Sequence, residues 1–248
     1  MSPKAFRYAA VLALCLPFPA AAGLAVDVEI LDRKSGEVLP VYWHEGERHI
    51  AGEPGREYEI RLKNRAGSRV LAVTSVDGVN VITGRTASLL GSGYVLDPRG
   101  TVAIDGWRKS MDEVAAFYFT ALPDSYAART GRPDNVGVVG VALFRERAPV
   151  MRMEEESRAS AEAAAPAAGA SSDSARAEKR LGTGHGRRLD SGATYTSFER
   201  ASDEPDKVIR IYYDSRKNLV ARGIIPRPQD RLAWRQPNPF PEAFVPDP

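Results

Sequence analysis

The sequence contains very little cysteine and histidine, with one cysteine and three histidines among 248 residues. A single cysteine cannot form a disulfide within the chain, so a small disulfide-linked scaffold is excluded. Neither sign of charge dominates, because 34 basic residues stand against 32 acidic ones at a formal net charge of +2. Hydrophobic residues make up 43% and charged residues 27%. These are ordinary values for a soluble globular protein, so collagen-like and coiled-coil chains are also excluded.

Long hydrophobic runs are also scarce, and the one that is present covers residues 8–18. Lys4 and Arg7 flank it on the N-terminal side and three alanines follow at residues 20–22. This pattern predicts a signal peptide over residues 1–22. The alternative for this run is a buried core helix. A membrane anchor is not expected, because the run is too short to span a bilayer. Cys15 raises the further alternative of a lipoprotein, which is disfavoured because Leu14 precedes it where a small residue is needed.

Removing the signal peptide changes the charge balance. Residues 1–22 hold two basic residues and no acidic ones, so residues 23–248 carry 32 of each sign. A chain without net charge gives no case for a nucleic-acid partner. The absence of a second long apolar run predicts no transmembrane segment after cleavage. We therefore expect an exported protein, periplasmic or secreted, whose lack of cysteine suits an oxidising compartment.

Residues 23–150 have the pattern of one β-rich domain. Residues 26–30 and 58–63 alternate apolar and polar side chains, which is the period of a half-buried strand. Residues 115–120 and 136–144 are nearly continuous apolar runs, typical of central strands covered on both faces. Short strands separated by turn signals predict an antiparallel β-sandwich, jelly-roll or immunoglobulin-like, rather than a doubly wound α/β fold.

Three local signals add detail to this domain. Asp77-Gly78 lies between apolar runs and predicts a hairpin, because both central residues of such a turn need positive φ. Residues 97–100 (DPRG) carry proline second and glycine fourth, which favours a type I turn. A short helix is expected at residues 125–129.

The chain beyond residue 150 resumes a β pattern only after a gap. Residues 151–180 are rich in alanine, serine and glutamate and predict a disordered linker, because they offer too little apolar surface to offset ordering entropy. Residues 181–225 predict a small β segment with strands at 194–198, 208–213 and 219–225. A segment of this size cannot fold alone, so we expect it to dock on the sandwich as a small β-hairpin segment that extends a sheet.

The C-terminal tail is rich in proline. Residues 226–248 contain seven prolines, which predicts an extended polyproline-like chain. Trp234, Phe240 and Phe244 are the residues that would hold this tail against a surface.

Catalytic signatures are absent from the sequence. There is no Gly-x-Ser-x-Gly elbow and no Ser-x-x-Lys, and residues 23–248 contain no thiol. Residues 43–49 (WHEGERH) are not the zinc-binding His-Glu-x-x-His, because the second histidine comes one position late. The favoured interpretation is a polar hairpin tip. The alternative is a catalytic site, and no metal or cofactor is predicted for it. Its candidates are His44, Glu45, Glu47, His49 and His185.

Residues 182–188 (GTGHGRR) are a candidate ligand-binding stretch, because glycines let backbone amides approach an anion and arginine can pair with it. A flexible glycine-rich entry to the last strands is the favoured alternative, since the Walker Lys-Ser/Thr pair is missing. The candidate ligand-binding residues here are Gly182, Gly184, His185 and Arg187.

Trp107 is a further candidate ligand-binding residue, because it stands beside Arg108 and Lys109. An exposed tryptophan next to two cations would bind a sugar or an anionic group. The favoured interpretation is that Trp107 closes the core at a strand end.

Four stretches carry a family resemblance: residues 73–81 (VTSVDGVNV), 93–96 (GYVL), 106–109 (GWRK) and 180–186 (RLGTGHG). They resemble a family of uncharacterised exported proteins of Gram-negative bacteria. The resemblance touches both predicted structured segments and skips the linker. It implies export to the cell envelope and supplies no catalytic motif.

These observations leave several functions open. The leading hypothesis is a non-enzymatic envelope protein, a β-sandwich that binds another protein or an envelope polymer. The alternative is an enzyme acting on envelope glycans or peptides, which requires residues 182–188 to reach the histidines of residues 43–49. A third is a stress or assembly factor without a small ligand. The sequence leaves strand order, ligand and oligomeric state open.

Overall fold

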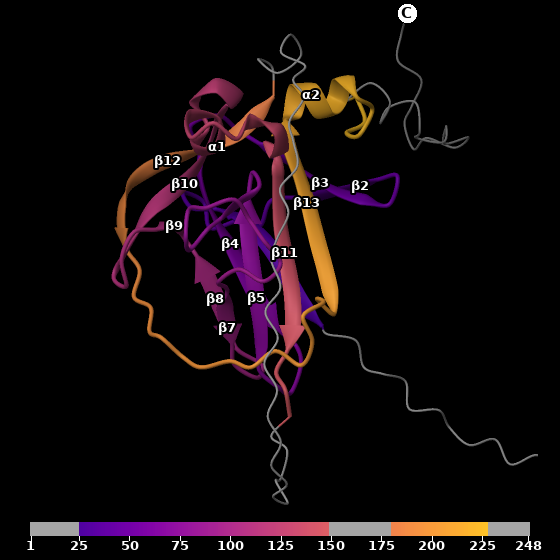
Figure 1. Ribbon diagram of the computed structural model, residues 1–248. Coiled ribbons are helices and arrows are strands. Elements are labelled where there is room, and N and C mark those ends of the chain that lie inside the picture. The colour runs from indigo at the N-terminus through magenta and orange to yellow at the C-terminus, as the bar shows by residue number, and fades with distance from the viewer. Residues whose placement is uncertain (1–24, 149–179, 228–248) are drawn as a thin grey trace, which may run out of the picture.

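The computed structural model describes residues 25–148 and 180–227, which form two packed β-sheets (Figure 1). Sheet A has six strands: β1 (Val26–Asp32), β4 (Glu57–Asn64), β8 (Thr101–Ile104), β9 (Gly106–Arg108), β10 (Glu113–Ala121) and β12 (Leu181–Asp190). Sheet B has seven: β2 (Val41–His44), β3 (Glu47–Gly52), β5 (Val70–Val76), β6 (Val79–Asn80), β7 (Tyr94–Leu96), β11 (Val138–Arg145) and β13 (Lys207–Ser215). The sheets do not close into a barrel, so the predicted β-sandwich is confirmed.

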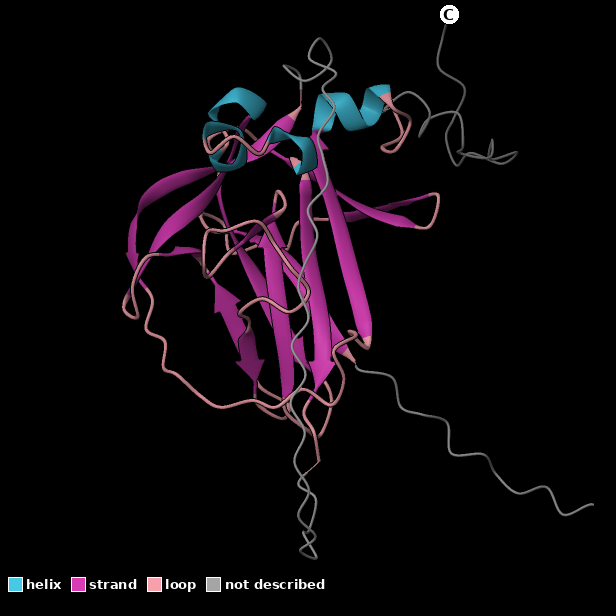
Figure 2. Ribbon diagram, viewed as in Figure 1, coloured by secondary structure: helices cyan, strands magenta, loops and turns pink. Residues whose placement is uncertain are grey.

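The helices are short and gather at one end of the two sheets (Figure 2). They are α1 (Tyr126–Arg129), α2 (Arg216–Ala221) and two single 3₁₀ turns, Leu122–Asp124 and Pro133–Asn135. The helix expected at residues 125–129 is confirmed as α1, which Ser125 caps by accepting a hydrogen bond from the Ala128 N–H at 3.2 Å.

The core lies between the sheets, and the predicted strand periods explain it. In β4, Tyr58, Ile60 and Leu62 are fully buried while the residues between them are half-buried. The two continuous apolar runs become β10, between β4 and β12, and β11, between β13 and β5. Both are central strands, as predicted, because each has a strand on either side; the facing sheet covers one face of each.

The two predicted turns have different outcomes. Asp77 (φ 53°) and Gly78 (φ 72°) form the expected hairpin turn between β5 and β6. The turn at residues 97–100 closes with a 2.9 Å hydrogen bond from the Gly100 N–H to the Asp97 carbonyl. Arg99 has a φ of 60°, so the type I prediction is wrong, since positive φ at the third position belongs to type II. Proline at the second position suits both types and does not discriminate between them.

The C-terminal segment docks on the sandwich, but not as a hairpin. Strand β12 pairs with β10 in sheet A, whereas β13 lies between β3 and β11 in sheet B. The segment therefore contributes one strand to each sheet, and its pairing with β3 is parallel. The expectation that it extends a single sheet is corrected, because two open strand positions are available to it.

Two of the three strands expected in this segment do not form. Residues 194–198 have no helix, turn or strand, although their residue types favour a strand. Residues 219–225 were expected as a strand but instead lie in α2 and the turn after it. Ser215 begins this helix by accepting a hydrogen bond from the Asn218 N–H at 3.2 Å, and Gly223 (φ 75°) follows its end. These capping signals outweigh the apolar pattern.

The predicted signal peptide (residues 1–22) and most of the predicted linker and Pro-rich tail lie outside the described residues. Within the described ranges, no helix has the length and apolar composition needed to cross a membrane.

Candidate functional site

The window that contains two histidines forms the β2–β3 hairpin, with Glu45 (φ 51°) and Gly46 (φ 78°) in its turn. This confirms the favoured interpretation of a polar hairpin tip. His44 pairs with Glu47 across the turn and Tyr42 with His49, so these four side chains share one face. The His44 and His49 rings are 6.3 Å apart between centroids. Within the described residues, no cluster of three or more potential ligands could hold a metal ion.

His49 is buried, and its neighbours include the His44 and Tyr212 rings and the charged side chains of Glu47 and Arg222. Its ring stacks on Tyr212 at 5.5 Å between centroids, and its Nδ1 has no hydrogen-bond partner among the described residues. Burial lowers the pKa of His49, and the positive charge of Arg222 lowers it further. The negative charge of Glu47 opposes this shift, but among the described residues no carboxylate is hydrogen-bonded to the Nδ1 of His49.

The glycine-rich stretch is not a loop, and this expectation is corrected. It forms the first part of β12, where Gly182 and Gly184 are buried against neighbouring side chains. A Cβ at Gly184 would lie 2.2 Å from the Tyr118 ring, and a Cβ at Gly182 would lie 2.6 Å from Ser125. Close packing therefore accounts for both glycines without a bound anion.

Trp107 closes the core, as the favoured interpretation predicted. Its side chain is 3% exposed, and its Nε1–H donates a 3.0 Å hydrogen bond to the Gly184 carbonyl. The ring packs edge-on against Phe117 at 5.1 Å. A ligand-binding role that needs an exposed indole does not fit this position.

The other two candidate residues of β12, His185 and Arg187, also have partners within the chain. Arg187 pairs with Glu57 through contacts of 2.8 and 3.1 Å. His185 lies 5.6 Å from the Tyr126 ring between centroids. Burial lowers its pKa, and Lys109 contributes to the same effect. Strand β12 lies at the edge of sheet A, whereas the β2–β3 hairpin belongs to sheet B on the other side of Figure 1. The enzyme alternative requires His185 to lie close to His44 and His49, and the structure does not bring these residues together.

A buried chain of hydrogen bonds connects the two sheets. Asp77 accepts bonds from the Gly137 N–H at 2.9 Å, from the Thr183 N–H at 2.8 Å and from the Tyr213 hydroxyl. Tyr213 therefore accepts from the Thr183 hydroxyl (2.6 Å), which in turn accepts from Tyr58 (2.7 Å). Burial raises the pKa of Asp77 to about 6, although the three donors oppose the shift. This network attaches β12 and β13 to the strands of residues 25–148, and its four side chains are buried.

Sequence reasoning assigned Asp77 only to its turn. The turn chemistry is correct, but the side chain also anchors residues more than 100 positions away in the chain. No local pattern signals such contacts, because the partners of Asp77 are Gly137, just before β11, Thr183 of β12 and Tyr213 of β13.

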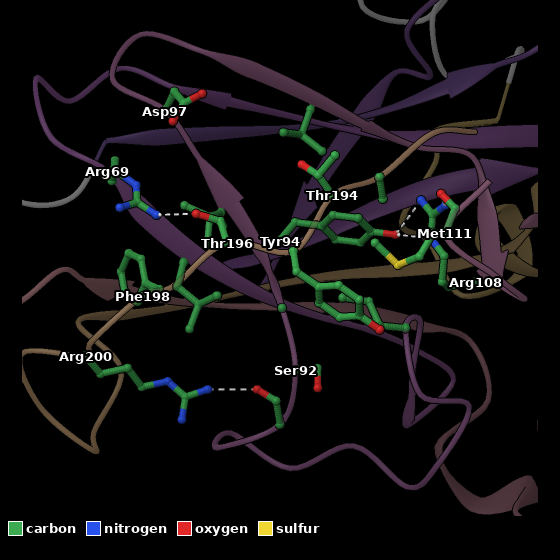
Figure 3. A pocket seen from close by; sticks show the side chains of 18 of the residues that line it. Arg69, Ser92, Tyr94, Asp97, Arg108, Met111, Thr194, Thr196, Phe198 and Arg200 are labelled. Atoms are coloured by element: carbon green, nitrogen blue, oxygen red, sulfur yellow. Dashed lines mark hydrogen bonds between the residues drawn. The ribbon is translucent and has the colours of Figure 1, made fainter. Parts of the chain in front are cut away.

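An open cavity of about 1150 Å³ lies between residues 191–203 and strands β7 and β8, and we call it the groove (Figure 3). Its lining combines aromatic rings with hydroxyls and arginines. Tyr94 of β7 presents its ring to the groove, and the Arg108 guanidinium donates to the Tyr94 hydroxyl at 3.1 Å. Tyr195, which also lines the groove, is 92% exposed. Sequence reasoning missed the groove because its walls come from separate parts of the chain.

Arginines hold the outer wall of the groove in place. Arg69 pairs with Glu146 at 2.8 Å and donates to the Thr196 hydroxyl at 3.2 Å and the Ser197 carbonyl at 2.8 Å. Further along, Arg200 donates to the Gly91 carbonyl at 2.7 Å. These bonds are made within the chain, so the arginines fix residues 194–200 beside the groove.

The backbone of residues 194–198 has unused hydrogen-bonding capacity. Within the part of the chain that the structure describes, no backbone carbonyl accepts a hydrogen bond from the N–H groups of these residues. Figure 1 shows this stretch as part of an open arc that runs from β12 to β13. Its residues, TYTSF, have the strand-forming character that led to the strand prediction.

Comparison of this chain with protein families, with curated proteins and with solved structures finds no match.

Proposed function

We propose that this protein is a non-enzymatic binding protein of the cell envelope, and that the groove takes an extended peptide segment of a partner protein. The peptide adds as a strand along residues 194–198 and lies over Tyr94 and Tyr195. The single observation that carries this proposal is the row of backbone donors beside an open groove, in a stretch with strand-forming residues and no strand partner among residues 25–148 and 180–227.

A protein that binds a peptide by strand addition offers it an extended stretch of its own backbone. An extended chain with unpaired N–H and C=O groups is a template for pairing with another chain. Main-chain hydrogen bonds supply affinity, and side-chain pockets on alternate residues supply specificity. Arg69 holds Thr196 and Ser197 from the side, so the template is ordered before a ligand arrives. A pre-ordered receptor loses less conformational entropy on binding.

The groove chemistry also supports binding rather than catalysis. Among the described residues that line it, none is histidine or cysteine, and its arginines are engaged within the chain. Aromatic rings such as Tyr94 and Tyr195 provide apolar contact area with few rotatable bonds. Export to the envelope rests on the charged, apolar and small-residue pattern of residues 1–22.

The first test locates the partner by photocrosslinking in cells. A benzophenone amino acid replaces Tyr195 in the groove or, as the control, Val208 on β13, which is also exposed. We expect one dominant crosslinked protein at position 195 and none of it at position 208. Equal labelling at both positions would contradict a specific site in the groove.

The second test asks whether the backbone N–H groups of residues 194–198 donate hydrogen bonds to the bound peptide. The synthetic peptide that matches the crosslinked segment is titrated into the Thr194→Pro and Tyr195→Pro variants. Proline removes a backbone donor, and successive N–H groups of an extended chain point to opposite sides. Because Tyr195→Pro also removes a ring that the peptide contacts, its affinity is compared with that of Tyr195→Ala. Measured in this way, loss of one of the two N–H groups should weaken binding by about tenfold, while loss of the other changes little. Unchanged affinity in both variants would refute strand addition.

A further inference from the structure

A second cavity lies at the base of the β2–β3 hairpin. It has a volume of about 440 Å³, within the range of about 300–1,000 Å³ that small binding sites occupy. Its apolar lining comes from Val38, Leu39, Pro40, Ala51 and Phe119. Val38 is 47% exposed, so the cavity is open at an apolar rim.

The charged residues around this cavity leave a negative surplus. Asp32 pairs with Arg56 at 2.8 Å, and these two charges compensate each other. Glu37 and Glu53 also line the cavity. In the described part of the chain neither forms an ion pair within 4.0 Å, although Glu53 interacts with Arg56 at longer range. An occupant with an apolar body and flanking positive charges would therefore complement the cavity.

The last described residues of the chain lie next to the same cavity. After α2, Ile224 and Ile225 are buried in a small cluster with Leu219, against which Tyr42 and Ala51 pack. Ala51 also lines the cavity, so it joins the cavity to the point where the described chain ends, at Arg227. Trp234 comes only seven positions after Arg227. Fully extended, they span about 23 Å, which is ample for a neighbouring cavity.

The sequence that follows Arg227 has the complementary chemistry. Residues 229–236 (QDRLAWRQ) contain no proline and place Trp234 between Arg231 and Arg235. Tryptophan supplies a large apolar surface with a polar N–H. The two arginines outnumber the one acidic residue of this stretch, Asp230, and match the carboxylates of Glu37 and Glu53.

We propose that residues 229–236 dock in this cavity of their own chain, with Trp234 in the apolar part and Arg231 and Arg235 facing Glu37 and Glu53. The tail then covers the base of the hairpin and joins it to the C-terminal segment. This interaction is independent of peptide binding in the groove, which lies between residues 191–203 and strands β7 and β8.

A disulfide-trapping experiment on residues 23–248 tests the proposal, because this stretch contains no native cysteine. Val38→Cys is combined with Ala233→Cys, and the matched control combines Tyr195→Cys, in the groove, with Ala233→Cys. Both first positions are exposed, so neither change removes core packing. Under mild oxidation we expect the intrachain disulfide to form about tenfold faster in the first pair, because docking raises the local concentration.

Charge exchange then separates docking from chance encounter. Glu37→Arg with Glu53→Arg should slow trapping of the first pair by about tenfold, and adding Arg231→Glu with Arg235→Glu should restore it. As a second readout, the lone thiol of Val38→Cys should alkylate faster when Arg231→Glu and Arg235→Glu are present. Equal trapping in both cysteine pairs would overturn the proposal. Faster trapping at position 195 would place the tail in the groove, and mainly interchain disulfides would place it on a second copy; either result overturns docking within the chain.

Discussion

Replacing Asp77 with asparagine should change how the stability of this protein depends on pH. Asparagine has nearly the same size, tolerates the positive φ of 53° at this position and does not titrate. Burial raises the pKa of the Asp77 carboxyl from its ordinary 3.8 to about 6. The folded protein therefore holds this proton more tightly than the unfolded chain does.

The sign and size of the effect follow from this difference in pKa. The stability contributed by Asp77 is fully present below pH 3.8 and is lost as the pH rises through about 6. The complete loss corresponds to about 3 kcal/mol, most of it between pH 4 and 7. Over this range the free energy of unfolding of Asp77→Asn should rise by about 2–3 kcal/mol relative to the unmodified protein.

Urea unfolding at pH values from 4 to 7 measures this difference, with the fluorescence of buried Trp107 as the reporter. Hydrogen bonding from Arg56 lowers the pKa of Asp32 to about 2, and because both proteins contain this pair its contribution cancels. A stability difference that stays constant across the range would refute the reasoning. It would mean that the donors from Gly137, Thr183 and Tyr213 compensate fully for burial of the carboxylate.

Three further predictions concern packing and titration. Gly106→Ala places a Cβ 2.0 Å from a backbone oxygen and should lower stability by about 3 kcal/mol in chemical denaturation, whereas Gly192→Ala, with open space around it, should stay within about 0.5 kcal/mol. Trp107→Phe loses a buried hydrogen bond and ring packing and should cost about 2–4 kcal/mol by the same assay, whereas Trp43→Phe, at a side chain 63% exposed, should cost about 0.5 kcal/mol or less. If the two tryptophan variants unfold alike, the core position of the first is wrong. His49 should titrate by NMR with a midpoint below pH 6.5, because burial lowers its pKa. Its contribution to stability is therefore present above pH 6.5 and is lost as the pH falls through the lower pKa of the folded protein. A midpoint at or above pH 6.5 would contradict the effect of burial.

Local patterns in the sequence were sufficient for much of the sandwich. Strand β4 follows from strict alternation, β10 and β11 follow from continuous apolar runs, and the Asp77-Gly78 turn follows from its need for positive φ. Each of these features depends on residues that are close together in the chain, so the physical cause can be read locally.

The candidate sites were harder to predict, because residue type does not reveal environment. Gly182 and Gly184 have the composition of an anion-binding loop, yet Ser125 and Tyr118 occupy the space that their missing side chains leave. The sequence allows Trp107 to be either exposed or buried. The folded structure shows that it is buried and that its N–H donates to the Gly184 carbonyl. The groove was not predicted at all, since Tyr94 and residues 191–203 meet only in the folded chain.

The sequence by itself determined that this chain is mainly β, that it builds a sandwich, and that a small C-terminal segment must dock on it, because hydrophobic period and segment size are local quantities. Tertiary structure alone decided that the two strands of this segment enter different sheets and that Asp77 joins them through Thr183 and Tyr213. It also decided that residues 194–198 border a groove and have no strand partner in the described part of the chain. These features depend on which backbone donors and acceptors find partners, and that is settled only when distant parts of the chain compete for the same sheet edges.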